Sequence, residues 1–230
     1  MLNGSSGSLV AVVRGLRDLV HELGEAGAAA VRRRGRGRIR GRQRLGRSER
    51  LEERLLLTLN VGLSSGNLLV DEPYSGADDL TIDYDTSKNE FVFRDSALNL
   101  TTSISGATGN GTKEIRVPKN RVSGDLITVQ TGSLGDVITV ASGFAPGSTR
   151  SLTISGGDGS DRVIWRSSSQ LTAISVTAES TDVDSAQVRS SGDQEWATAA
   201  TLVSSVDLIG FNIALSGVSA GSKNLKVQGA

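Results

Sequence analysis

The chain contains no cysteine and a single histidine, His21. Without cysteine there can be no disulfide, no thiolate nucleophile and no cysteine-ligated metal. Because His21 lies near the N-terminus, the rest of the chain cannot supply a Ser-His-Asp or Cys-His constellation or a histidine-ligated zinc site. These catalytic classes are therefore excluded for the part of the sequence that follows the N-terminal segment.

Proline and aromatic residues are also scarce, whereas glycine is abundant. The 230 residues include three prolines and 28 glycines, and aromatic side chains make up 3%. Glycine well above its usual share of about 7%, with so little proline, is typical of a β protein with many tight turns. No run of about 18 apolar residues is present, so we expect no transmembrane segment.

The formal net charge of zero hides two regions of opposite sign. Residues 1–54 carry thirteen arginines, no lysine and six acidic residues, whereas residues 55–230 carry twelve basic and nineteen acidic residues. Such an asymmetry indicates that the two regions work in different surroundings.

Residues 1–47 read as a helical and then a disordered basic segment. Apolar residues recur at helical spacing from Leu9 to Leu23, and arginine alternates with glycine over residues 31–47. The basic stretch could contact phosphates, but it has no aromatic residues for base stacking, so no specific nucleic acid is expected as a partner. The alternatives are the positive region of an export signal and a solvated basic arm.

From Val61 onward the sequence consists of short apolar runs separated by turn clusters. The connection Ser87-Lys88-Asn89 predicts an antiparallel hairpin. The expected strands, rich in β-branched and aromatic residues, lie at residues 67–70, 79–84, 90–93, 102–104, 114–117 and 126–129.

A weak repeat runs through this region. Residues 124–129 (GDLITV) are echoed by residues 135–140 (GDVITV), and Asp161 opens another apolar run 25 residues after Asp136. Short strands at close spacing with many glycines predict an all-β fold, a right-handed parallel β-helix (β-solenoid), with a β-sandwich as the alternative. No capping element precedes Ala230, so we expect this chain to be part of a longer one.

One turn carries a metal-binding pattern. Residues 156–164 (GGDGSDRVI) fit the calcium nonapeptide G-G-x-G-x-D-x-U-x at every fixed position. Glycines allow the backbone carbonyls to turn toward an ion, and calcium prefers six to eight oxygens. The alternative is a plain turn in which Asp161 binds the backbone. The candidate ligands are Gly156, Gly157, Asp158, Gly159, Asp161 and, from the similar turn at residues 132–136, Asp136.

A second acidic group comprises Glu179, Asp182 and Asp184. Paired carboxylates can serve glycoside hydrolysis, but a solvated loop or sheet edge explains them as well. Trp165 and Trp196 could stack on sugars or pack inside the fold. The expected core of the C-terminal part includes Leu202, Val206, Leu208, Ile213 and Leu215.

Two segments carry a family resemblance. Residues 51–57 (LEERLLL) resemble the LEPR-XLL motif of large bacterial exported and surface repeat proteins, with Glu53 in place of the proline. Residues 156–164 resemble one repeat of the RTX family. The first resemblance implies export, with residues 48–60 serving sorting. The second implies calcium held between the turns of consecutive repeats.

These observations lead to one expectation for domains and function. The segments are 1–47 (basic), 48–60 (sorting-like motif) and 61–230 (β-solenoid). We expect a non-enzymatic structural or adhesive module of a bacterial surface or secreted protein, with calcium as candidate cofactor and with surface polysaccharide or other surface proteins as partners. The alternative is a carbohydrate-binding or carbohydrate-active β-helix protein that uses Arg162, Arg166, Asp158 and Asp161.

Overall fold

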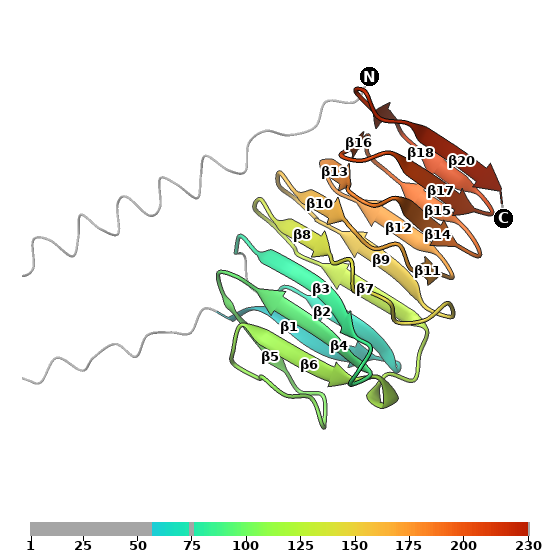
Figure 1. Cartoon of the computed structure of the whole chain (residues 1–230). Helices are drawn as coiled ribbons and strands as arrows, with labels where there is room; N and C mark the ends of the chain where they lie inside the picture. Colours follow the sequence, from blue (N-terminus) through green and yellow to red (C-terminus); the bar gives the residue numbers. More distant parts are fainter. Residues whose placement is uncertain (1–56, 74–75, 230) are drawn as a thin grey trace, which may run out of the picture. The chain divides into compact units, whose positions relative to one another are not determined.

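A computed structural model describes residues 57–73 and 76–229 (Figure 1). The expected N-terminal helix, the arginine-rich stretch and nearly all of the motif at residues 51–57 lie outside the described residues. Within them the fold is all-β, as predicted, with one 3-10 turn, η1 (Lys119–Arg121), and no α-helix. None of the described residues belongs to a helix long and apolar enough to cross a membrane.

The strands form three sheets, which we call the first, second and third sheet in the order in which the chain enters them. In spatial order, the first sheet contains β18 (Ile213–Leu215), β15 (Gln194–Trp196), β12 (Ile174–Thr177), β9 (Ser151–Ser155), β7 (Leu126–Gln130), β2 (Asn67–Asp71), β1 (Leu57–Ser64) and β5 (Asn99–Thr102). The second contains β19 (Val218–Ser219), β16 (Ala200–Leu202), β13 (Ser180–Val183), β10 (Arg162–Trp165), β8 (Val137–Val140), β3 (Asp79–Asp85), β4 (Glu90–Asp95) and β6 (Glu114–Pro118). The third contains β11 (Gln170–Leu171), β14 (Gln187–Ser190), β17 (Val206–Gly210) and β20 (Leu225–Gly229).

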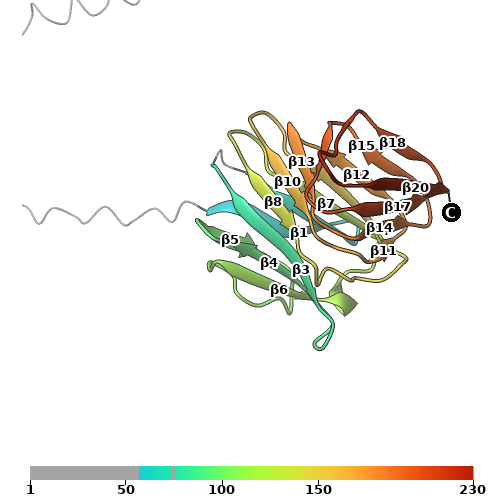
Figure 2. The same cartoon turned by 45° about the horizontal axis from the view of Figure 1, so that its top comes forward.

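From β9 onward the chain visits the three sheets in turn, and we call each circuit a coil. Each strand pairs in parallel with the strand of the same sheet in the next coil. In the first sheet Leu152 pairs with Ile174, and Ile174 pairs with Gln194. Figure 2 shows the strands of the third sheet lying side by side. Equivalent residues of successive coils therefore lie above one another.

The N-terminal part of both large sheets contains antiparallel pairs, whereas β1 and β5 pair in parallel. β1 pairs antiparallel with β2, and β4 pairs antiparallel with both β3 and β6. The predicted hairpin is confirmed, because Asp85 and Glu90 close the β3–β4 ladder. The Asp85 carboxylate accepts hydrogen bonds from the Ser87 hydroxyl and from the backbone of Lys88, which lowers the pKa of Asp85 to about 2. This local bonding explains why the turn forms here.

The eleven-residue echo in the sequence does not join stacked strands. Residues 124–129 lead into β7 of the first sheet, whereas residues 135–140 form β8 of the second. The 25-residue relation is the one that stacks, since Val137 of β8 pairs with Arg162 of β10. Similar sequences therefore form two consecutive strands that belong to different sheets.

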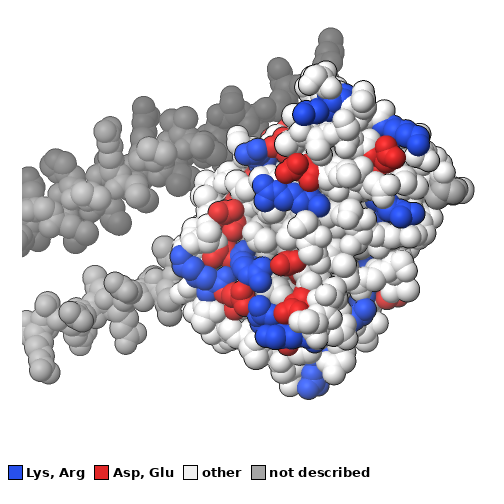
Figure 3. Space-filling model, in the orientation of Figure 1, with Lys and Arg blue, Asp and Glu red and all other residues white. Residues whose placement is uncertain are grey.

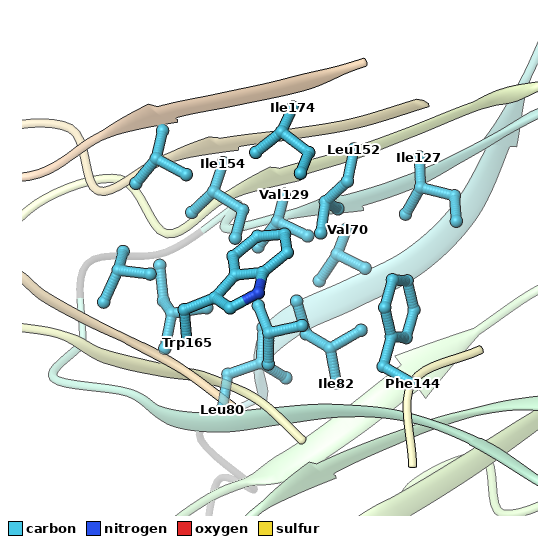
Figure 4. Close-up of a cluster of buried hydrophobic side chains, with 14 of the residues drawn as sticks. Val70, Leu80, Ile82, Ile127, Val129, Phe144, Leu152, Ile154, Trp165 and Ile174 are labelled. Atoms are coloured by element: carbon cyan, nitrogen blue, oxygen red, sulfur yellow. The ribbon is translucent and has the colours of Figure 1, made fainter. Parts of the chain in front are cut away.

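Alternating side chains from the sheets fill one continuous core (Figure 4). Trp165 and Trp196 are both buried, in an edge-to-face pair with ring centroids 5.5 Å apart, so neither ring is exposed for stacking on a sugar. The Trp165 indole donates a hydrogen bond to the Ser167 carbonyl. Of the expected C-terminal core residues, Leu202, Val206 and Leu208 are buried, and Ile213 and Leu215 are partly buried.

Replacing Trp165 should test this core. We expect Trp165→Ala to lower the free energy of unfolding by about 3–5 kcal/mol, because it removes a fully buried ring and one of the two side-chain hydrogen bonds that the Ser167 carbonyl accepts. Urea unfolding followed by circular dichroism measures the loss. The matched control is Arg166→Ala, next in sequence and half exposed, which should cost less than about 1 kcal/mol. Equal losses in both variants would contradict the assignment.

Candidate metal centre

Two turns between the first and second sheets stack directly on each other. They are residues 131–136, between β7 and β8, and residues 156–161, between β9 and β10. The Asp158 backbone N–H donates to the Gly132 carbonyl at 2.9 Å, and the Thr131 hydroxyl donates to the Gly156 carbonyl at 3.1 Å. The structure thus brings together the two turns that the sequence suggested as halves of one site.

Glycines make this close stacking possible. Gly157 has φ of +90°, and a side-chain carbon at this position would overlap the Gly132 carbonyl oxygen. A side-chain carbon at Gly159 would likewise overlap the Leu134 carbonyl oxygen. Glycine is therefore required at both positions for the turns to touch backbone to backbone.

A ladder of acidic residues runs along one corner of the stack. Asp78, Asp136, Asp161 and Glu179, which we call the acid ladder, immediately precede β3, β8, β10 and β13. The backbone N–H of Asp78 donates to Asp136 Oδ1 at 2.8 Å, and that of Asp136 donates to Asp161 Oδ1 at 2.9 Å. The N–H of Asp161 donates to Glu179 Oε2 at 2.8 Å. The carboxylates of Asp136, Asp161 and Glu179 therefore each bind the backbone of the preceding ladder residue and fasten successive levels of the stack together.

Three members of the acid ladder are buried. Asp78, Asp136 and Asp161 are 3%, 0% and 1% exposed, whereas Glu179 is exposed. Burial raises the pKa of Asp136 and of Asp161, although each accepts a backbone hydrogen bond that acts in the opposite direction. The N–H of Asp161 lowers the pKa of Glu179. Asp136 and Asp161 therefore hold a proton more tightly than a free aspartic acid does, and Glu179 holds one less tightly than a free glutamic acid.

Sequence reasoning named Asp136 and Asp161 but missed two members of the acid ladder. It did not include Asp78, and it grouped Glu179 with the acids that follow in sequence. A signal was present, since an acidic residue stands directly before each of four strands of the same sheet. Recognising it required knowing which strands share a sheet.

The residues fit a calcium ion only in part. Asp136 Oδ2 and Asp161 Oδ2 are buried without a hydrogen-bond partner, as expected of oxygens that could hold a cation. Calcium takes six to eight oxygens, however, and the Gly132 and Gly156 carbonyls already accept hydrogen bonds. Within residues 57–73 and 76–229 no three acidic side chains converge as metal ligands would.

The other acidic pair lies on the outward side of the second sheet. Asp182 belongs to β13, and Arg162 Nε of the preceding coil donates to Asp182 Oδ2 at 2.9 Å. Arg166 Nε lies 3.5 Å from Asp184 Oδ2. Figure 3 shows basic and acidic side chains interspersed on one face of the molecule. These carboxylates therefore cross-link neighbouring coils, Asp182 from an internal strand and Asp184 from the connection directly after it.

The glycine requirement is testable with two alanine variants. Gly157→Ala should lower the free energy of unfolding by more than about 3 kcal/mol, because backbone strain of about 1–3 kcal/mol is added to overlap with the Gly132 carbonyl. The matched control is Gly111→Ala, which also has positive φ, +78°, but open space around it. Urea unfolding of both variants separates strain from overlap. Similar losses would show that the turns do not touch as described.

Comparison with known proteins finds no match for this chain. No family model matches the chain, and neither a curated protein nor a solved structure matches it. The function must therefore be argued from the sequence and the geometry of the described residues.

Proposed function

We propose that the β region is a right-handed parallel β-helix, or β-solenoid, that serves as a non-enzymatic structural or adhesive module of a large exported bacterial surface protein. The observation that carries the proposal is the uninterrupted parallel pairing from coil to coil in all three sheets. A stack held in this way resists bending and displays a long repetitive surface, which suits a spacer or an adhesive stalk.

The strand connections support the β-helix over the β-sandwich. In a sandwich, neighbouring strands are mostly antiparallel and joined by hairpins or Greek-key connections. Here each strand from β9 onward is followed by a strand of a different sheet. The chain returns to the same sheet one coil later, and the two strands pair in parallel. Right-handedness follows from the strong preference of parallel strand connections for that hand.

Export rests on the sequence. The motif at residues 51–57 resembles one found in exported repeat proteins, and residues 55–230 are acidic. The partners proposed for such a module are surface polysaccharide and other surface proteins, contacted through the outward faces of the sheets. Since those faces present side chains already paired between coils, such as Arg162 with Asp182, we assign them to holding and display rather than to catalysis.

The alternative is a carbohydrate-active protein, favoured by the gathering of Arg162, Arg166, Asp182 and Asp184 on two adjacent coils. Incubating the full chain with acidic and neutral bacterial polysaccharides separates the two. We expect the polysaccharides to keep their size and reducing-end content, whether or not they bind. Cleavage that is lost in Asp182→Ala, while the exposed control Asp125→Ala keeps it, would overturn the non-enzymatic proposal.

Calcium stiffening of the two stacked turns is the second part of the proposal, and it rests on the unpartnered Oδ2 atoms of Asp136 and Asp161. We expect 10 mM calcium at pH 7.5 to raise the melting temperature of the chain by about 3 °C, as weak binding to the folded form would. Magnesium, which demands tighter octahedral geometry, should have a smaller effect. Asp161→Asn should abolish the shift. A melting temperature that calcium leaves unchanged would remove the ion and leave the rest of the proposal standing.

A further inference from the structure

The outward side of the first sheet carries hydroxyl groups and no charge over three adjacent strands. β7, β9 and β12 lie side by side, and none of their residues is charged or aromatic (Figure 1). Alternate residues of these strands are buried in the core, and those between them face outward. The outward residues with a hydroxyl group, which we call the hydroxyl face, are Thr128, Ser151, Thr153, Ser155, Ser175 and Thr177.

Parallel pairing arranges the hydroxyl face as a grid. Thr153 of β9 pairs with Thr128 of β7 on one side and with Ser175 of β12 on the other. Ser155 likewise pairs with Thr177. Neighbouring strands lie about 4.8 Å apart, and outward residues recur along a strand about every 6.6 Å. The hydroxyls are therefore spaced regularly in both directions.

The hydroxyls of this face are available to a ligand. Within residues 57–73 and 76–229 none of the six makes a hydrogen bond to another group of the chain. The outward side of the second sheet differs, because Arg162 donates to Asp182 and Arg116 donates to Asp85. Each free hydroxyl can donate one hydrogen bond and accept two. Since β9 is paired on both sides and threonine has few χ1 rotamers, these groups are largely ordered before a ligand binds.

Acidic residues outside the core border the hydroxyl face. They are Asp71, Asp125, Asp158, Glu179 and Glu195. Asp71 lies on β2 and Glu195 on β15, the strands on either side of the face, and Arg150, the basic residue next to β9, is buried. Like charges brought together across an interface oppose binding, so this border disfavours an anionic polymer and the same face of a second copy. An uncharged ligand meets no such repulsion.

We propose that the hydroxyl face binds an extended, uncharged, β-linked polysaccharide whose chain runs across the strands, along the stack. This docking role rests on the proposed structural or adhesive function and specifies the sheet and the class of polysaccharide.

The spacing of the grid suits such a chain. Adjacent strands are about 4.8 Å apart, which is close to the length of one sugar ring in an extended chain, so successive rings meet successive coils. With no aromatic side chain on the face for stacking, binding comes from many individually weak hydrogen bonds. A long chain therefore binds through repeated contacts, whereas a disaccharide does not.

The test is binding of the full chain to suspensions of amorphous cellulose and of β-1,4-mannan, two uncharged polysaccharides, measured by depletion from solution. We expect binding that changes little between about 50 mM and 500 mM NaCl, because no charged group takes part. Thr128→Val/Thr153→Val should bind about tenfold more weakly, because valine keeps the branched shape but lacks the hydroxyl. The matched control, Thr81→Val/Thr201→Val on the outward side of the second sheet, should bind like the wild type.

The proposal fails if neither polysaccharide binds, or if the Thr128→Val/Thr153→Val variant binds as tightly as the wild type. Binding that falls steeply with salt would assign the contact to the basic residues 1–54 and would also overturn it. If the valine pair fails to fold, Ser155→Ala/Ser175→Ala removes two other hydroxyls and should weaken binding similarly. Cleavage of a bound polysaccharide would contradict the non-enzymatic function but not the docking face, whereas absence of binding would leave that function standing.

Discussion

The parallel main-chain ladder between coils is the interaction on which the rest of the structure depends. It fixes the register of each strand against the same strand of the next coil, so that Leu152, Ile174 and Gln194 lie in one column. A column brings together the side chains that the sequence places at the same position of successive coils. Apolar columns build the core, and the Arg162–Asp182 and Arg166–Asp184 contacts join neighbouring coils on the outside.

The same register creates a column of acidic residues that is costly to bury. At the corner before the second sheet the backbone N–H groups of Asp78, Asp136 and Asp161 turn away from the strand ladder and need acceptors. A carboxylate from the next coil supplies each acceptor, and those of Asp136 and Asp161 are buried beside other carboxylates. A cation between the two turns, as proposed for calcium, would relieve that conflict without giving up the hydrogen bonds.

Sequence patterns predicted individual strands and turns better than they predicted which strands stack on one another. Alternation of apolar residues located β3 and β4, and the Ser87-Lys88-Asn89 turn between them forms as expected. The 102–104 run was misplaced, because the strand ends at Thr102 and Ile104 is buried outside it. Period-two alternation shows which side of a strand is apolar but not which sheet the strand joins. For this reason the GDLITV echo looked like a stacking repeat, and Glu179 was grouped with Asp182.

The length of the turns limits how far an ion site like the one proposed between residues 131–136 and 156–161 can extend along the stack. A site between consecutive turns needs two turns long enough to carry both glycines and a carboxylate, as residues 131–136 and 156–161 are. The following connections between the first and second sheets shrink to residues 178–179, 197–199 and 216–217. At the position after Glu179 the next coil has Ala199, which offers no carboxylate. Among the connections that the structure describes completely, the proposed ion at this pair of turns would therefore act on one junction. The coils beyond it depend on their core, on main-chain pairing and on side-chain hydrogen bonds such as that from Asn212 Nδ2 to Asp193 Oδ1.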